Sequence, residues 1–299
     1  MRKLTNNKKI HLHQVALIAI SSSDIKPSIE ALVKSSEEIN FNEKIFITSR
    51  ESLDESDINQ CSSNGIEIKY IDQIKSVNEY SFFILRSLQN FFNSDFCLII
   101  QWDGWVINPN SWLSEFLNYD YIGAIWPKEI WPEKEGYRVG NGGFSLRSKK
   151  LCIATSEIIQ NHTIEETNII EDEFIGKNYR DLLESKYKIQ ISTEILANKF
   201  SIERAKWDSR SFGFHGFFNF NKIFNDKDLF DKLETLNIGC FSTRLSYDLA
   251  INLIKEKRFY ISRKVIDKRF QCSGFTRKNL RLKIFWIIFK LIYKDNSQI

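Results

Sequence analysis

The 299-residue sequence contains little proline and little glycine, with 4 and 12 residues respectively. Collagen-like, linker-rich and low-complexity proteins are therefore excluded, because their repeats need far more of both. The five cysteines are widely spaced and include no Cys-x-x-Cys pair, so neither a disulfide framework nor a zinc knuckle is predicted. Long apolar runs are also missing, because no stretch reaches the ~18 uncharged residues of a membrane-spanning helix.

The amino-terminal segment is basic, but the apolar run that follows it, Val15–Ile20, is only six residues long. A secretory signal peptide needs a longer apolar region and a cleavage site of small residues. We therefore expect a cytoplasmic protein, with a peripheral contact to the inner face of the membrane as a further expectation.

Charge is spread unevenly along the chain. The net charge is only +4, which does not indicate nucleic acid as a partner. Residues 255–299, however, carry 13 Lys and Arg against 3 Asp and Glu. Within this tail, Arg277–Lys294 mixes six basic residues with many apolar ones, which is typical of a helix lying on an anionic membrane surface. A terminal helix packed on the protein body is the alternative.

Aromatic residues are abundant, at 14%, and with 42% hydrophobic residues they indicate a folded protein. Apolar runs predict four strands, and helical spacing predicts helices at about 27–39 and 77–92. The strands are expected at Val15–Ile20, Lys44–Ser49, Ile66–Ile71 and Phe96–Val106. This alternation predicts an open α/β sheet of the nucleotide-binding kind, in which ligands bind beyond the carboxyl ends of the strands.

The pattern changes after this region. Residues 108–150 hold three of the four prolines and predict loops and turns. Helices are expected at 148–160, at about 171–186 and within 226–270, and residues 189–220 are expected to be irregular. We therefore divide the chain into an amino-terminal arm (1–14), an α/β domain (15–225) and a helical extension with a basic tail (226–299).

Two clusters near the predicted sheet carry candidate chemistry. In Gln101–Gly104, Asp103 follows the most apolar strand, and its carboxylate suits a hard divalent cation such as Mg²⁺. In Val139–Ser148, closely spaced glycines would let the backbone approach a ligand. An ordinary strand-end turn and an ordinary glycine-rich turn are the alternatives.

Three further candidates lie on predicted helices or loops. The acidic run at Glu171 and Asp172 fits either a general base or the charge favoured at a helix start. His215 lies among aromatic residues, as a metal ligand or as a packed core histidine. Arg86 is expected at the surface, with phosphate binding as the alternative.

Five motifs occur in order: QWDGWVINPNSW, YDYIGAIWP, VGNGGFSLRSKKL, EDEF, and ANKFSIE paired with FGFHGF. Together they resemble a bacterial family of uncharacterised glycosyltransferase-like proteins found among genes for surface polysaccharide. The resemblance covers residues 15–220. That family is similar in turn to glycosyltransferases of the GT-A fold, so the resemblance implies a Rossmann-like open mixed sheet flanked by helices.

The resemblance also implies residue roles, because GT-A enzymes share an Asp-x-Asp metal element, a glycine-rich loop, an acidic catalytic motif and a late histidine. Carried over, Asp103 and His215 would hold Mn²⁺ or Mg²⁺. Asp172, beside Glu171, would be the general base. The residues expected to bind the donor or substrate are Gln101, Trp102, Gly104, Asn141, Gly142, Gly143 and Arg86.

Gln101 stands where the first acid of the metal element is expected. A neutral amide holds a divalent cation less well than a carboxylate, so metal dependence stays open. The implied activity is sugar transfer from a nucleotide-sugar donor to a glycan or lipid-linked glycan acceptor. Inversion is expected, because a candidate base is present and no nucleophile motif is evident. A non-catalytic nucleotide- or glycan-binding protein with the same fold is the alternative. A nucleotidyltransferase lacks support, since no lysine-bearing glycine-rich motif follows the first strand.

Overall fold

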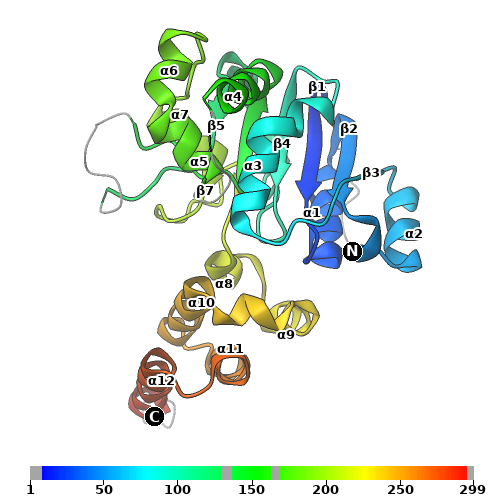
Figure 1. Ribbon diagram of the computed structural model, residues 1–299. Helices are drawn as coiled ribbons and strands as arrows, with labels where there is room; N and C mark the ends of the chain where they lie inside the picture. The colour runs from blue at the N-terminus through cyan, green and yellow to red at the C-terminus, as the bar shows by residue number, and fades with distance from the viewer. Residues whose placement is uncertain (1–8, 129–136, 163, 165–168, 295–299) are drawn as a thin grey trace. The chain divides into compact units, whose positions relative to one another are not determined.

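The computed structural model describes residues 9–128, 137–162, 164 and 169–294. The chain divides into two compact units, with the boundary between His215 and Gly216 (Figure 1). The first unit is built on an open sheet, and the second unit is helical. The predicted domain limits at residues 14 and 225 stay predictions.

The first unit contains a six-stranded mixed sheet in the order β3-β2-β1-β4-β6-β5. Neighbouring strands among β3, β2, β1 and β4 run parallel, whereas β6 is antiparallel to both β4 and β5. The predicted α/β class with an open mixed sheet is therefore confirmed. The strands are β1 (Ile10–Ile20), β2 (Ile39–Thr48), β3 (Glu67–Tyr70), β4 (Phe96–Ile100), β5 (Tyr121–Ile122) and β6 (Phe144–Ser148).

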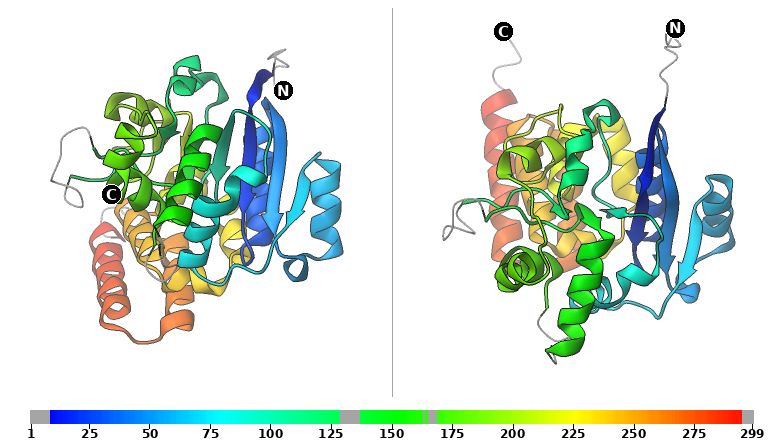
Figure 2. Two further views of the ribbon diagram at one scale, coloured as in Figure 1. Left: turned by 45° about the horizontal axis from the view of Figure 1, so that its top comes forward. Right: turned by 90° about the horizontal axis from the view of Figure 1, so that it is seen from above.

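Helices cover both faces of the sheet. On one face, Ile84 of α3, Leu88 directly after α3, and Cys152 of α4 join the core formed by alternate residues of β1, β2 and β4. On the opposite face lies α1, as Figures 1 and 2 show. The longer helices of the first unit are α1 (Ile25–Ser36), α2 (Glu55–Ser63), α3 (Val77–Ser87) and α4 (Lys149–Asn161). The central strands are buried on both sides, which explains their continuous apolar runs.

Shorter elements complete the first unit. They are α5 (Glu171–Glu173), a π-helical turn (Phe174–Asn178), α6 (Arg180–Ser185), α7 (Glu194–Phe200), and the parallel pair β7 (Ser201–Ile202) and β8 (Gly213–Phe214). The second unit contains α8 (Phe220–Ile223), α9 (Asp226–Thr235), α10 (Arg244–Lys255), α11 (Phe259–Ser273) and α12 (Arg277–Lys294). No helix in the described part of the chain combines the length and apolar character needed to cross a bilayer.

Several predicted boundaries were wrong. The first strand begins at Ile10 and not at Val15 as predicted, and residues 1–8 lie outside the described part. The strand expected to reach Val106 ends at Ile100, because a tight turn follows. The predicted helix 171–186 is interrupted by the π-helical turn, and the region expected to be irregular contains α7, β7 and β8.

Candidate functional site

A cavity of about 730 Å³ opens at the carboxyl ends of β1 and β4. Ile20, the last residue of β1, and Gln101, directly after β4, both line it. From β1 the chain continues to β2, which lies on one side of β1, whereas β4 lies on the other side. The order of the strands therefore changes direction between β1 and β4. In open α/β sheets this point is where ligands bind. The cavity therefore lies at the edge of the sheet where the sequence predicted ligand binding, and that binding stays a prediction.

Two helices begin at this cavity. Asp24, the N-cap of α1, and Ser76, the N-cap of α3, both line it. The backbone N–H groups and the dipoles at helix N-termini favour anions. Lys75 lines the cavity beside the start of α3 and adds a cation. The Lys75 ammonium and the helix starts therefore favour an anion here, whereas the Asp24 carboxylate on the same wall opposes one.

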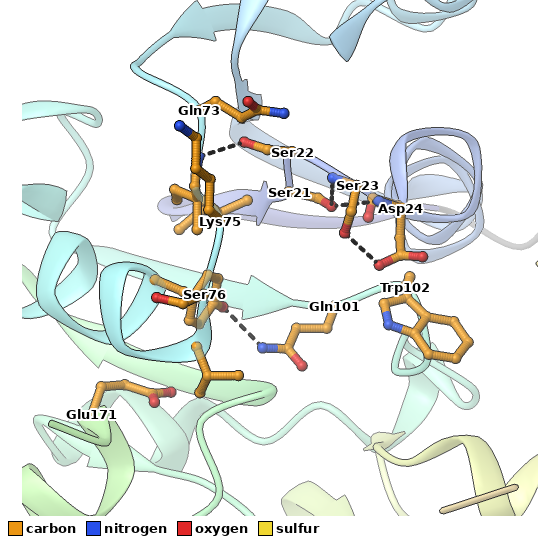
Figure 3. A pocket seen from close by; sticks show the side chains of 15 residues that line it. Ser21, Ser22, Ser23, Asp24, Gln73, Lys75, Ser76, Gln101, Trp102 and Glu171 are labelled. Carbon is orange, nitrogen blue, oxygen red and sulfur yellow. Dashed lines mark hydrogen bonds between the residues drawn. The ribbon is translucent and has the colours of Figure 1, made fainter. Parts of the chain in front are cut away.

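A serine loop, Ser21–Ser23, follows β1 and also lines the cavity (Figure 3). Its conformation is held by hydrogen bonds: Ser21 Oγ accepts from the Asp24 N–H at 3.0 Å, and Ser22 Oγ accepts from the Ile74 N–H at 3.1 Å. Sequence analysis gave this loop no role. Its position directly after the first strand of an α/β sheet is the signal that could have identified it.

The segment after β4 folds into a tight turn in which the Gly104 N–H donates to the Gln101 carbonyl at 3.0 Å. Gln101 and Trp102 line the cavity, whereas Asp103 is 3% exposed and does not line it. A Cβ at Gly104 would lie 2.7 Å from the Phe214 carbonyl oxygen, so this position packs against backbone. The glycine therefore serves packing of the turn in this structure, and its predicted donor contact stays a prediction.

His215 directly follows β8 and contacts the turn that contains Gln101 and Asp103. Its Nε2 lies 3.2 Å from Asp103 Oδ1 and 3.2 Å from Gln101 Oε1. Its Nδ1 lies 3.8 Å from Glu203 Oε1. Burial lowers the pKa of His215, but Asp103 and Glu203 raise it more, to about 10. The imidazole is therefore charged at neutral pH and is held between two carboxylates.

This arrangement bears on the expected metal. Asp103 and His215 are brought together, as predicted, but they contact each other. A protonated imidazole has no lone pair for a cation. Within residues 9–128, 137–162, 164 and 169–294, no group of three or more His, Cys, Asp or Glu side chains could hold a metal ion. Asp103 and His215 contact each other in this structure, and their metal role stays a prediction.

The glycine-rich loop packs between His215 and Glu171. A Cβ at Gly143 would lie 2.1 Å from His215 Nε2, and a Cβ at Gly142 would lie 1.8 Å from Glu171 Oε1. The close approach predicted for these glycines is therefore to protein side chains. Asn141 takes a left-handed φ of 52° and is buried, and its Oδ1 accepts no hydrogen bond from any residue that the structure describes. The donor contacts expected of this loop stay predictions.

Glu171 belongs to the cavity wall. Its Oε1 lies 3.2 Å from Arg147 Nη2, and its Oε2 accepts from Ser81 Oγ at 3.3 Å. Arg147 is fully buried on β6, so the carboxylate is fixed in position. Sequence analysis missed Arg147, because nothing in the pattern FSLRS indicates an inward-facing arginine.

Asp172 lies next to this wall and is half-buried. Burial and the charge of Glu171 raise the pKa of Asp172 to about 7, although the Glu173 N–H, which donates to its Oδ1 at 2.8 Å, acts against this. Asp172 does not line the cavity. Of the two acids, Glu171 therefore reaches the cavity, and Asp172 titrates near neutral pH.

Arg86 lies elsewhere. It lines a different hollow of about 600 Å³, and its guanidinium lies 5.6 Å from the centre of the Phe82 ring. The structure does not bring Arg86 to the main cavity. Tyr80, also on α3, lines the main cavity, and its hydroxyl accepts a hydrogen bond from Gln101 Nε2 at 3.0 Å. Sequence analysis did not select Tyr80, since a tyrosine within an amphipathic helix gives no signal of its own.

Comparison with protein families gives a match over residues 64–215, about half of the chain, to the family described as "Protein of unknown function (DUF5672)". The chain belongs to this family. The matched residues of this DUF5672 protein include the QWDG turn, the glycine-rich loop, the acidic pair and His215. No curated protein matches the chain.

Solved structures with some likeness include three enzymes. A mannosyltransferase from Pyrobaculum calidifontis, in complex with GDP-Man and Mn²⁺, is 8% identical with a TM-score of 0.39; the match covers 60% of this chain and 54% of that one. This chain thus spans about half of that mannosyltransferase. A cytidylyltransferase from Leptospira borgpetersenii is 12% identical, with coverages of 61% and 74% and a TM-score of 0.30. The apo-form glycosyltransferase GlyE from Streptococcus pneumoniae is 11% identical, with coverages of 94% and 63% and a TM-score of 0.29. At such TM-scores, none of these likenesses bears on function.

Proposed function

We propose that this DUF5672 protein is a glycosyltransferase that moves a sugar from a nucleotide-sugar donor to a glycan or lipid-linked glycan acceptor in surface polysaccharide biosynthesis. One observation carries the proposal. A cavity large enough for a nucleotide lies where the connections of an open α/β sheet diverge, between two helix N-termini and a fixed carboxylate. The sequence resemblance supplies the reaction class.

The donor diphosphate is assigned to the helix N-termini. Negative charge grows on the diphosphate as the glycosidic bond breaks, and donors aimed at developing charge stabilise the transition state. The first turns of α1 and α3 and the ammonium of Lys75 would supply this stabilisation. The serine loop and the ring of Trp102 would bind the nucleoside, whose polar edges and apolar faces they match.

The acceptor hydroxyl needs a base before it can attack. Both oxygens of Glu171 already accept hydrogen bonds, from Arg147 and Ser81, so this carboxylate is suited to position an acceptor. Asp172 has a pKa near neutrality, which is the range in which a general base works best. We therefore assign acceptor positioning to Glu171, which lines the cavity, and proton removal to Asp172, the role that the sequence resemblance implies, which requires the acceptor hydroxyl to reach this carboxyl beside the cavity wall. Direct displacement with this base would invert the anomeric carbon.

Thermal shift measurements with a panel of nucleotide sugars, with and without Mn²⁺, test binding. A ligand at 100 times its Kd stabilises the folded protein by about 2.7 kcal/mol. At least one nucleotide sugar should raise the melting temperature, and the corresponding free sugar should not. If no nucleotide or nucleotide sugar shifts the transition, the cavity assignment is wrong.

Release of the nucleotide from the stabilising donor tests catalysis. Asp172→Asn should lower turnover by ~10²–10⁴-fold and leave the donor-induced thermal shift unchanged. Glu157→Gln, a change of an exposed carboxyl on α4, is the control and should leave both turnover and thermal shift unchanged.

The alternative of a non-catalytic binding protein is favoured by the neutral Gln101, which lies between Tyr80 and His215. A donor shift without any turnover in the native protein would establish that alternative.

A further inference from the structure

One face of the terminal helix α12 (Arg277–Lys294) is packed within the second unit. Leu282 and Trp286 are buried, and the Trp286 indole N–H donates to the Phe259 carbonyl at 3.0 Å. Asn279 is also buried, and its amide donates to the Gly274 carbonyl at 2.9 Å. The tail is therefore an anchored helix, in agreement with the packed-helix alternative considered for the sequence.

The opposite face of α12 is apolar and exposed. Six of the fourteen exposed large apolar side chains in the described residues lie on this helix, whereas most of the others are spread singly over different elements. They are 41–62% exposed and comprise Leu280, Ile284, Ile287, Ile288, Leu291 and Ile292. Their spacing of three or four residues places them on one side of a helix with 3.6 residues per turn. Scattered apolar residues need no explanation, but a continuous stripe indicates a binding surface.

Basic side chains border this stripe on both sides. By helical spacing, Lys278 falls along one edge, and Lys283 and Lys290 fall along the other. Arg277 and Arg281 fall within the stripe, toward its amino-terminal end. The helix contains six Lys and Arg and no acidic residue. Such residues can lay their apolar stems along a hydrophobic surface and keep their charges at its polar boundary.

We propose that this face of α12 binds the surface of an anionic lipid bilayer. Its apolar stripe would enter the boundary between headgroups and acyl chains, and its flanking cations would meet lipid phosphates. A second copy of the chain fits less well, because two such helices would bring twelve cations together without an acid between them. The proposal is independent of the transferase assignment, since it uses no residue of the cavity.

Co-sedimentation of the full chain with vesicles tests this proposal. The native protein should sediment with vesicles of phosphatidylcholine and phosphatidylglycerol, and much less with phosphatidylcholine alone. The variant I284S/I288S/L291S should bind at least ~10-fold more weakly, because it removes apolar surface from the stripe. The matched control I58S/I153S/I195S changes side chains that are 42%, 44% and 76% exposed on other helices, and it should bind like the native protein.

A second variant separates charge from apolar insertion. K278Q/R281Q/K290Q should lose the preference for anionic vesicles and the sensitivity of binding to salt. All replaced side chains are exposed, so circular dichroism should show unchanged folding in every variant. Equal binding by the native protein and I284S/I288S/L291S would overturn the proposal. A native dimer that this variant converts to a monomer, with no vesicle binding, would overturn it in favour of a second copy of the chain.

Discussion

Asp172 illustrates how the site acts at the scale of a single residue. Burial and the charge of Glu171 make ionisation of this carboxyl unfavourable, and they raise its pKa from 3.8 to about 7. Between these values the folded chain binds a proton that the unfolded chain does not, so the free energy of unfolding falls as pH rises through this range. Above about pH 7 the folded protein carries the full cost of a poorly solvated carboxylate.

Asp172→Asn removes this cost, because an amide is neutral at every pH. We expect the variant to be more stable than the native protein at pH 8, by on the order of 2 kcal/mol, since partial exposure reduces the effect. Near pH 4 the two proteins should be equally stable. Urea unfolding at both pH values measures the difference. Glu157→Gln, at an exposed position, should change little at either pH, and a D172N protein that is no more stable at pH 8 would contradict the raised pKa.

At the scale of elements, the short pair β7 and β8 determines where His215 and Glu203 lie. The Ser201–Gly213 and Ile202–Phe214 pairs bring the two segments side by side. The pair is backed by a buried cluster of four aromatic rings whose centres lie 5.2–6.3 Å apart: Phe116, Phe144, Phe200 and Phe212. A Cβ at Gly213 would lie 2.1 Å from the Phe144 ring, so β8 lies directly on this cluster.

Phe212→Ala should therefore disturb the site as well as the core. Loss of a fully buried Phe side chain costs about 3–5 kcal/mol of unfolding free energy, which urea unfolding would detect. The ring NMR signals of His215 should shift as β8 moves. Ile195→Ala, on exposed α7 surface, should change neither quantity. A stability loss below 1 kcal/mol, well under the range for a buried Phe, would show that the cluster does not support β8.

Elements could be predicted where one pattern dominates. The apolar runs of β1 and β4 identified parallel central strands, and these placed Gln101 at the carboxyl edge of the sheet, where the cavity lies. The helix α7 was missed although Thr193 is an N-cap whose side chain accepts from the Leu196 N–H, because the helix is only seven residues long. The roles of Gly142 and Gly143 could not be predicted, since they depend on side chains that reach the loop from distant segments.

At the scale of the whole molecule, the cavity and the terminal helix belong to different units. All residues that line the cavity lie between Ile20 and Glu171, in the first unit. The second unit has its own buried side chains on α10, α11 and α12. Its Arg269 donates to the Phe241 carbonyl at 3.0 Å and to Asn279 Oδ1 at 3.1 Å, which ties α12 to the rest of this unit. The two units can therefore differ in stability.

A leucine-to-alanine change, made separately at two positions of α12, tests whether the two units differ in stability. Leu282 is fully buried and Leu291 is 62% exposed, so Leu282→Ala removes core contacts and Leu291→Ala does not. Leu282→Ala should lower the stability of the second unit by about 2–5 kcal/mol. Hydrogen exchange should then rise in α10, α11 and α12 and stay unchanged in β1, β2 and β4. Leu291→Ala should leave exchange unchanged in both units. An equal rise in the central strands with Leu282→Ala would instead mean that the two units unfold together, because a local loss of packing would then have spread through the whole chain.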